Sequence, residues 1–593
     1  MGAAALVMTA SAASCGRCGE RNEEATPTTR PEEPSVPAPD QLLADVYMVT
    51  PNASWAKLQR NIGGAVGILP ASAAGIIGAA AGLDPFVTSE IDGAAPIYGV
   101  VAGDPANAGF VIAMKLLDPR KARAILVDGE TASFTPKEDA GVTELVPKGQ
   151  PSDGRPGDVP VVVGLSPNGY VLVARRSADL AALAPYATRT LPRKPLPSSA
   201  AVVLDVPASA LGTVMKPKLE GLWSSAKTFL LAEDEAMRRS HGGRAPDYGD
   251  PKAIVGVIDS WVTKRIGVVG DLERMRLSID IIEDGVSVVS TMTPAAGGGP
   301  ARKWTDAMKL GDTTAIAALP ATTAAALVMR DGDDERAEQA STIESAITAA
   351  LGARLAEGDA KKLHDVAVDF TKARAEVFSA GLAWDEPRGI SLRAPVRDAE
   401  AASRAVRGAV ELAKVAPFKE LLRVREVSTS LEDVPGFGKA SIVTIAREPA
   451  RADVGELRTA RVSRDAGVPS AVGRGDAGAA PAARGRQNGL AWIVSGDILS
   501  MAGGETPAAT LGATARPERR LSDEPAIARS LAALAAKSSA VLVLQPLRFD
   551  VARANLPAAP LVIALGRQGT DATFRIDVAN GLLREVVRWQ MGL

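Results

Sequence analysis

The most specific chemical signal is a pair of cysteines, Cys15 and Cys18, which are the only cysteines among 593 residues. The Cys-x-x-Cys spacing fits a redox pair, half of a metal site, or one modified cysteine beside a chance neighbour. A redox pair needs a helix behind it to lower the thiol pKa, and a zinc site needs a second pair of ligands. Residues 19–41 hold five prolines and no second cysteine pair follows, so modification of Cys15 is favoured and the other roles stay open.

The segment before Cys15 indicates the kind of modification. Residues 1–14 are apolar and small, and they are too few to cross a bilayer, which takes about 20 residues. The stretch Ala12-Ala13-Ser14-Cys15 resembles the lipobox of bacterial lipoproteins. This resemblance implies that residues 1–14 are a signal peptide and that a lipidated Cys15 anchors the mature chain to a membrane.

The N-terminal sequence differs from the usual lipoprotein pattern at two points, and one residue after Cys15 bears on the location. Ala12 stands where a leucine is usual, and no basic residue precedes the apolar stretch, so we expect the signal to begin upstream of residue 1. Gly16 replaces the aspartate that retains many such proteins at the inner membrane. The expected location is therefore extracytoplasmic, with the outer membrane favoured over the inner and the body in the periplasm.

Other chemistry-bearing residues do not form a recognisable site. His241 lies in a glycine-rich polar stretch and His364 in a helical pattern, so we interpret both as surface or helix-face residues. The acidic run at 331–335 lacks calcium spacing and suits a helix N-terminus, and 436–441 lacks one glycine of a phosphate loop. We predict no catalytic residue, metal ligand or cofactor, although a pair of facing carboxylates is invisible in sequence.

The composition narrows the class of protein. Hydrophobic residues make up 46% and charged residues 23%, which is enough apolar material for several large cores. The net charge of −2 and the aromatic content of 4% give no basic surface with stacking side chains, so nucleic acid is not an expected partner.

The body, from residue 42 onward, is expected to contain two copies of one α+β module. We place the lipidated cysteine and a disordered tether at 15–41, the modules at 42–293 and 309–593, and a linker at 294–308. Hairpins dominate, so each copy should be a mainly antiparallel sheet with helices packed on it. The pattern resembles uncharacterised duplicated domains of bacterial extracytoplasmic proteins, and that resemblance implies no functional residues.

Five paired segments support the duplication. Strand-like 44–51 is matched with 314–320, each followed by a helix, which in the second copy covers 321–330. The other pairs are 97–126 with 376–410, 170–187 with 491–504, 198–206 with 538–546, and 276–292 with 562–578. Two helices, 215–239 and 251–265, are an insertion in the first copy, and 464–488 is a flexible loop in the second.

Two apolar segments have alternative interpretations. Residues 66–82 are expected to form a buried helix or helical hairpin, or else a surface of small residues that leaves room for an apolar ligand or lets another chain approach closely. The amphipathic helix 215–239 is expected to pack into the core through its apolar side chains, or else to face a partner or membrane. These apolar side chains are Leu219, Leu222, Trp223, Phe229 and Leu230.

The sequence therefore predicts a non-enzymatic, lipid-anchored cell-envelope protein with a binding or structural role. One alternative is a carrier of an apolar ligand or lipid, with a cavity between sheet and helices. Another is a hydrolase that uses two carboxylates. The expected partners are the membrane, through the anchor, and an apolar ligand or an envelope protein.

Overall fold

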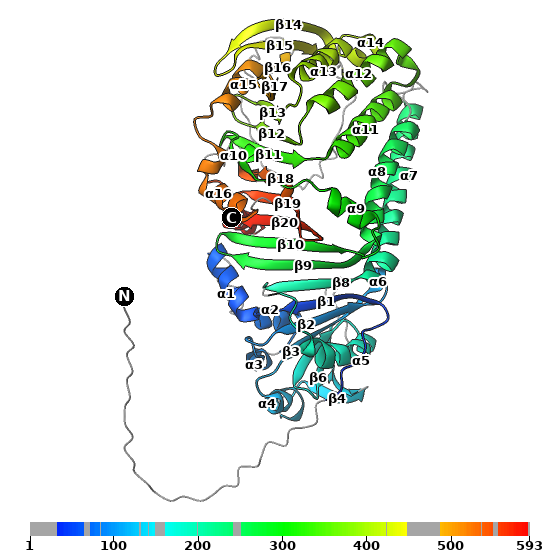
Figure 1. Ribbon diagram of the computed structural model, residues 1–593. Coiled ribbons are helices and arrows are strands. Elements are labelled where there is room, and N and C mark those ends of the chain that lie inside the picture. Colours follow the sequence, from blue (N-terminus) through cyan, green and yellow to red (C-terminus); the bar gives the residue numbers. More distant parts are fainter. Residues whose placement is uncertain are drawn as a thin grey trace, which may run out of the picture.

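Figure 1 shows the chain as a computed structural model. The structure describes residues 33–63, 72–83, 85–129, 132–139, 141–148, 161–198, 200–240, 251–422, 424–447, 487–534, 537–549 and 556–590. The signal segment, Cys15, Cys18 and nearly all of the 464–488 loop lie outside these residues, so the predictions made for them stay predictions.

The described chain is a mixed α and β structure built on one large antiparallel sheet. Ten strands from the first half of the chain form one side of it, and every pairing is antiparallel. From the outer edge inward their order is β4 (Phe134–Asp139), β5 (Val142–Pro147), β6 (Val162–Ser166), β7 (Tyr170–Ala174), β3 (Gly109–Lys115), β2 (Ile97–Ala102), β1 (Leu42–Met48), β8 (Val202–Pro207), β9 (Leu272–Ile282) and β10 (Gly285–Pro294).

Ten strands from the second half continue the sheet in the same order. From the opposite edge inward these are β14 (Val424–Val434), β15 (Gly438–Arg447), β16 (Gln487–Ser495), β17 (Ile498–Gly504), β13 (Gly389–Pro395), β12 (Val377–Ala383), β11 (Thr323–Arg330), β18 (Ser538–Leu544), β19 (Leu561–Gln568) and β20 (Asp571–Ala579). The last strands of the two halves, β10 and β20, pair with each other, for example Val288 with Ile576. One continuous sheet therefore runs the length of the molecule (Figure 1).

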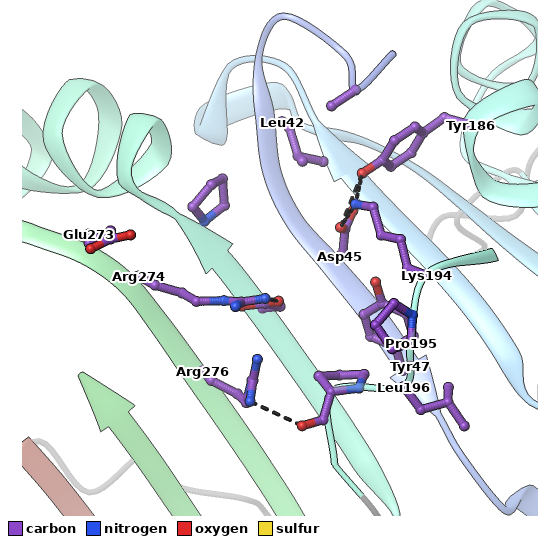
Figure 2. Close-up of a pocket in the computed structure, with 14 residues that line it drawn as sticks. Leu42, Asp45, Tyr47, Tyr186, Lys194, Pro195, Leu196, Glu273, Arg274 and Arg276 are labelled. Atoms are coloured by element: carbon purple, nitrogen blue, oxygen red, sulfur yellow. Dashed lines mark hydrogen bonds and ion pairs between the residues drawn. The ribbon is translucent and has the colours of Figure 1, made fainter. Parts of the chain in front are cut away.

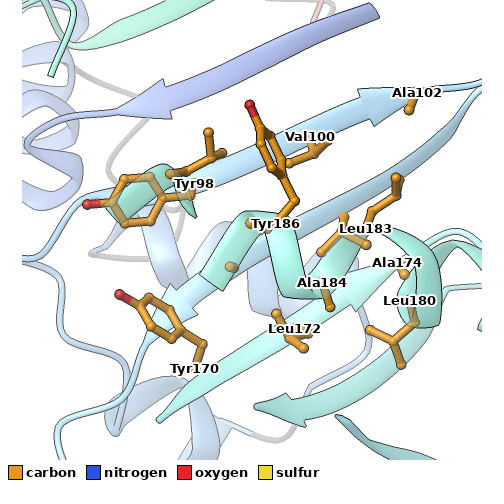
Figure 3. Close-up of a cluster of buried hydrophobic side chains, with 14 of the residues drawn as sticks. Tyr98, Val100, Ala102, Tyr170, Leu172, Ala174, Leu180, Leu183, Ala184 and Tyr186 are labelled. Carbon is orange, nitrogen blue, oxygen red and sulfur yellow. The ribbon is translucent and has the colours of Figure 1, made fainter. Parts of the chain in front are cut away.

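The helices of the first half cover both faces of its sheet. Short helices lie between β1 and β2, namely α1 (Pro51–Ile62), α2 (Ala73–Ala80) and α3 (Pro85–Ser89), and α4 (Pro119–Arg123) follows β3. On the opposite face α5 (Ser177–Pro185) and its continuation pack Leu180, Leu183 and Tyr186 on β2 and β7, as Figure 3 shows. A long helical pair, α7 (Lys216–Ser240) and α8 (Pro251–Gly270), is inserted between β8 and β9.

The helices of the second half are arranged differently. They are α10 (Thr314–Ala317), α11 (Asp333–Leu351), α12 (Glu357–Ala373), α13 (Ala399–Leu412), α14 (Ala416–Leu422), α15 (Pro507–Ala515), α16 (Pro525–Leu534) and α17 (Asn580–Gln590). The helix α9 (Pro300–Ala307), which precedes them in the linker, packs Ala301 and Trp304 on the first half. The helix α11 packs beside α8, so the inserted pair of the first half reaches the second half. Among the described helices none is both long enough and apolar enough to cross a membrane.

The structure corrects one secondary-structure prediction and confirms others. Residues 314–317 are helix α10 and 323–330 are strand β11, which is the reverse of the expected strand and helix. An alanine run favours helix by intrinsic propensity, but here it pairs with β12 and β18 in the centre of the sheet, and tertiary pairing overrides propensity. The hairpins within 97–126 and 376–410 and the inserted helices α7 and α8 are as predicted.

The expected core packing of α7 is also wrong for three of its apolar residues. Leu222, Phe229 and Leu230 are exposed, and Trp223 instead donates a hydrogen bond to Asp259 of α8 at 2.6 Å. The pair α7–α8 packs one side of each helix on the other, which leaves the outer stripe of α7 uncovered. Of the expected buried segment 66–82, residues 66–71 lie outside the described part of the chain, and helix α2 buries Ala73 and Ala74.

The end of the predicted tether is ordered on the first half. The Thr190 hydroxyl accepts a hydrogen bond from the Val36 amide at 2.9 Å and donates one to the Val36 carbonyl at 2.7 Å. The Glu33 carboxylate pairs with Arg189 at 2.6 Å, and its carbonyl accepts from Arg193 at 2.6 Å. These contacts fix the chain beside the segment that follows α5.

Candidate functional site

A pocket of about 570 Å³ opens on the sheet of the first half, on the face that carries α5 (Figure 2). Its floor comes from β1, β8 and β9, and one wall comes from the segment that follows α5. The lining residues are Ala38, Leu42, Asp45, Tyr47, Tyr186, Lys194, Pro195, Leu196, Pro197, Asp205, Pro207, Glu273, Arg274 and Arg276.

Strand register brings the polar residues of the floor together. Asp45 on β1 lies opposite Asp205 on β8, and Asp205 lies opposite Arg276 on β9. Residues directly opposite on adjacent strands share a face, with Cβ atoms about 5 Å apart. Side chains alternate between faces along a strand, so Tyr47 joins Asp45 on this face. The result is a polar row, Arg276–Asp205–Asp45, that crosses three strands.

Asp45 is the centre of a cluster that joins the floor of the pocket to the wall after α5. Its Oδ2 atom accepts hydrogen bonds from the Tyr186 hydroxyl at 3.1 Å and from Lys194 Nζ at 2.9 Å, and Lys194 Nζ also lies 2.5 Å from the Tyr186 oxygen. Burial lowers the pKa of Lys194, but its bonds to Tyr186 and Asp45 outweigh burial and hold that pKa above its usual value. Burial raises the pKa of Tyr186. At neutral pH the lysine is therefore an ammonium and the tyrosine a neutral phenol.

Asp205 is neutralised by a different cation. Arg274 Nε donates to Asp205 Oδ1 at 2.5 Å and its Nη2 donates to Oδ2, which is a two-point pairing of guanidinium and carboxylate. The hydrogen bond to Asp205 is the main reason that the pKa of Arg274 is raised. Arg276 Nη1 donates to the Pro197 carbonyl at 3.0 Å and so ties β9 to the opposite wall.

Several polar groups of the pocket lack a hydrogen-bond partner. Among the described residues, neither Asp45 Oδ1 nor Arg276 Nε has one, although both atoms are buried. The Tyr47 hydroxyl also has none within the described part of the chain, and burial raises the pKa of Tyr47, so it stays a neutral donor and acceptor. Buried polar atoms without a partner are unfavourable, so the pocket has hydrogen-bonding capacity left for a ligand or water.

The equivalent place in the second half is apolar and covered. The last hairpin of each half has its turn at an equivalent place, Ile282–Gly285 in the first half and Gln568–Asp571 in the second. Arg276 lies six residues before Ile282 and Val562 lies six residues before Gln568, so these two residues are equivalent. On the neighbouring strands, Val543 of β18 lies opposite Val562, and Ala326 of β11 lies opposite Val543.

The row Val562–Val543–Ala326 thus replaces Arg276–Asp205–Asp45. All three residues are buried under α10 and α16 in one apolar cluster. The same three strand positions therefore form a closed core in one half of the molecule and a polar floor in the other.

A second, smaller cavity of about 210 Å³ lies on the opposite face of the first half, beside α2. It is almost wholly apolar, and it includes Val46, Met48, Ile77, Ile97 and Ile112. This volume is below the range of about 300–1,000 Å³ that is typical of ligand pockets, so the cavity could hold only a small ligand.

The residues singled out in the sequence lie away from these cavities. His364 is exposed on α12 with Nδ1 3.2 Å from the Glu344 carboxylate, as expected for a helix-face residue, and His241 lies outside the described residues. The described chain holds no group of three or more side chains arranged for a metal ion. The pocket residues were missed, although Asp45 and Asp205 each interrupt an apolar strand, which was the available signal.

The acidic run at 331–335 does begin helix α11, with Asp333, Asp334 and Glu335 in its first turn. Asp331, the first residue of this acidic run, belongs however to a buried network of ion pairs. Asp331 is 1% exposed, accepts from Arg336 Nη1 at 3.0 Å, and also accepts from Arg374 at the end of α12. Burial lowers the pKa of Arg374.

Comparison with known proteins adds no assignment. No protein-family model matches the chain, and neither a curated protein nor a solved structure matches it.

Proposed function

We propose that this is a non-enzymatic binding protein of the bacterial cell envelope, anchored through Cys15, whose first half binds a small zwitterionic ligand in the polar pocket. The observation that carries the proposal is the polar row in an open pocket, at the position where the other half has an apolar row under helices. A cavity lined by a few converging polar groups is the usual form of a ligand site.

The charges of the pocket favour a ligand with both signs. Its lining holds three acids, Asp45, Asp205 and Glu273, and three bases, Lys194, Arg274 and Arg276. Such a balanced lining gives no net attraction to a polyanion or polycation, but it can orient a molecule that has an ammonium at one end and a carboxylate at the other. Pro195, Leu196 and Pro197 add an apolar wall, so we expect an amino acid or a short peptide with an apolar side chain.

A binding role is favoured over carboxylate hydrolysis by the ion pairs. Asp45 and Asp205 face each other, as two catalytic carboxylates would. Each carboxylate is already bound to its own cation, however, Asp45 to Lys194 and Asp205 to Arg274. In a hydrolase of this kind the two carboxyl groups act on the scissile bond, whereas here both are engaged by cations of the pocket itself.

The proposal includes duplication of one module, 42–293 and 309–593. The identical order of ten strands in the two halves supports it, as does the pairing of equivalent strands β10 and β20. After duplication the first copy would have kept or gained a site, while the second closed over an apolar core.

The anchor would hold the pocket close to a membrane. Glu33, the first described residue, is fixed on the first half, and Ala38 lines the pocket. The segment from Cys15 to Glu33 reaches at most roughly 60 Å when extended. Mass spectrometry of the mature N-terminus tests the anchor: Cys15→Ser should lose the lipid and the matched Cys18→Ser should keep it. A protein that retains residues 1–14 contradicts the anchor alone.

Calorimetric titration tests the pocket. The probe is the dipeptide Leu-Leu with free termini, and its N-acetylated, C-amidated form is the matched probe without charges. We expect binding of the free dipeptide only, weakened at least tenfold by Asp205→Val or Arg276→Val. Arg404→Ala, which removes an exposed pair with Asp369 in the second half, is the control and should leave binding unchanged. Equal binding of both probes, or no binding of either, contradicts the zwitterion site.

A carrier of an apolar ligand is the second candidate, and the apolar cavity beside α2 is the observation that favours it. Octanoate is a suitable probe for that volume. Val46→Phe should fill the cavity and abolish octanoate binding while Leu-Leu binding stays; no octanoate binding by the unaltered protein removes this candidate.

A further inference from the structure

The long sheet has two outer edges, and in the described part of the chain they differ in how well they are protected from pairing with another chain. The edge strand β4 is six residues long and contains Pro136 and the charged run Lys137-Glu138-Asp139. Short length, proline and charge are the devices by which proteins keep an edge strand from pairing with another chain. The edge strand β14, at the top of Figure 1, has eleven residues and no proline, and the centre of it, 427–431, is uncharged.

The strand β14 also exposes an apolar side chain that its own half does not use. Val427 packs against the cluster that contains Val406 of α13 and Trp492 of β16. Leu431 is four residues along the strand and therefore on the same face, but it is 69% exposed. Among the described residues β14 pairs only with β15, so its outer backbone groups have no ladder partner.

We infer that β14 pairs antiparallel with β14 of a second copy of this chain, about a two-fold axis at Thr429. A symmetric antiparallel pair must place one residue opposite its own copy, and Thr429 is the central residue of β14. The pairing would join two sheets into one. It is independent of the ligand pocket, which lies in the other half.

This register makes β14 complementary to itself. Arg425 lies opposite Asp433 of the second copy, and the two-fold axis makes this ion pair twice. Val427 lies opposite Leu431 of the second copy, so each exposed leucine extends the other copy's apolar cluster. Ser428 meets Ser430. The one unfavourable contact, Glu426 opposite Glu432, also occurs twice and should weaken the dimer.

Neighbouring registers lose this complementarity. An axis at Ser428 places Arg425 opposite Leu431, and an axis at Ser430 places Asp433 opposite Val427. Coupling between Arg425 and Asp433 is therefore a property of the Thr429 axis alone.

Sedimentation equilibrium of the full chain tests the pairing. All proteins carry Cys15→Ala, so that no lipid contributes to association. We expect a reversible dimer, with Kd raised at least tenfold by Arg425→Asp or by Asp433→Arg. The double variant Arg425→Asp/Asp433→Arg should return Kd to within threefold of the starting value. Glu426→Gln/Glu432→Gln should lower Kd.

Matched controls separate pairing from misfolding. The equivalent charge reversal on the other edge, Lys137→Glu, should leave Kd unchanged, and circular dichroism should show the same fold for every variant. A protein that stays monomeric at millimolar concentration overturns the inference. A dimer whose Kd is indifferent to both single reversals, or whose double variant is not restored, overturns it as well.

Discussion

The two halves of the molecule share one strand order but use the same sheet face in opposite ways. In the second half Val562, Val543 and Ala326 lie under α10 and α16 and form a core. In the first half Arg276, Asp205 and Asp45 occupy the matching positions, and within the described part of the chain they line an open pocket. The backbone ladder is the same in both, so side-chain polarity on a few strand positions decides whether that face becomes a core or an open pocket.

The two halves also differ in how much water reaches the partners of their buried carboxylates. In the first half Asp45 is paired with Lys194, which is 39% exposed and so remains partly hydrated. In the second half Asp331 lies between Arg336 and Arg374, whose guanidinium groups have almost no access to water. A charge at the rim of a pocket can be solvated when its partner is removed, whereas a charge inside a core cannot.

The largest expected effect is therefore at Asp331. Asp331→Asn would leave the buried Arg374 without a compensating charge and Arg336 with only the exposed Asp333, and should lower the free energy of unfolding by about 3–5 kcal/mol. Denaturant unfolding measures it. Asp333→Asn, at an exposed member of the same network, is the control and should cost less than about 1 kcal/mol. Equal losses in the two variants would show that burial does not govern this network.

High pH should lower the stability of the first half, because all five tyrosines lie there. Burial raises the pKa of Tyr47, Tyr98 and Tyr186, and that of Tyr170 to about 12. A folded pKa above the unfolded value of 10 gives stability below pH 10 that is lost as the pH rises through the folded value. For Tyr170 alone this is at most roughly 3 kcal/mol.

Absorbance at 295 nm reports the ionisation of these phenols. It should rise in one cooperative step between about pH 10 and 12, together with the loss of ellipticity. A gradual rise centred at the ordinary phenol pKa, with the fold intact, would mean that the tyrosines are not held in a core.

A smaller effect is expected at Asp45. Asp45→Ala removes the acceptor of Lys194 and Tyr186, but the lysine can turn to water, so the loss of stability should be about 1–3 kcal/mol. Thermal unfolding with Asp331→Asn in parallel measures the difference. If Asp45→Ala costs as much as Asp331→Asn, the contrast between rim and core charges is wrong.

The smallest effect is expected where the inserted helices of the first half contact the second. Lys264 Nζ of α8 lies 2.6 Å from Glu338 of α11, and both side chains are exposed. Lys264→Ala should change stability by less than about 1 kcal/mol, and by still less in high salt. A loss above 2 kcal/mol in chemical denaturation would show that this bridge couples the halves.

The sequence allowed some of these features to be predicted, because their signals are local. Asp118, which is followed by Pro119, and Asp398 each mark a turn before a helix, and in the structure they cap the first turns of α4 and α13. The alanine-rich strand β11 was mistaken for helix because its strand neighbours come from distant parts of the chain.

The pocket was not predicted for the same reason. Asp45, Lys194, Asp205 and Arg276 meet only through the register of β1, β8 and β9 and the path of the chain after α5. A single polar residue in an apolar strand shows that something must neutralise it, but it does not show which residue does so.

The pairing of β10 with β20 has a consequence for how the chain is made. When β10 leaves the ribosome its partner has not been synthesised, because β20 lies close to the C-terminus and nearly half of the chain comes between them. Until then β10 has one unpaired edge, and an unpaired strand edge favours aggregation with other chains. Contacts of such long sequence separation also form slowly. Keeping the first half unfolded until β20 has been made would therefore be expected to raise the yield of folded protein.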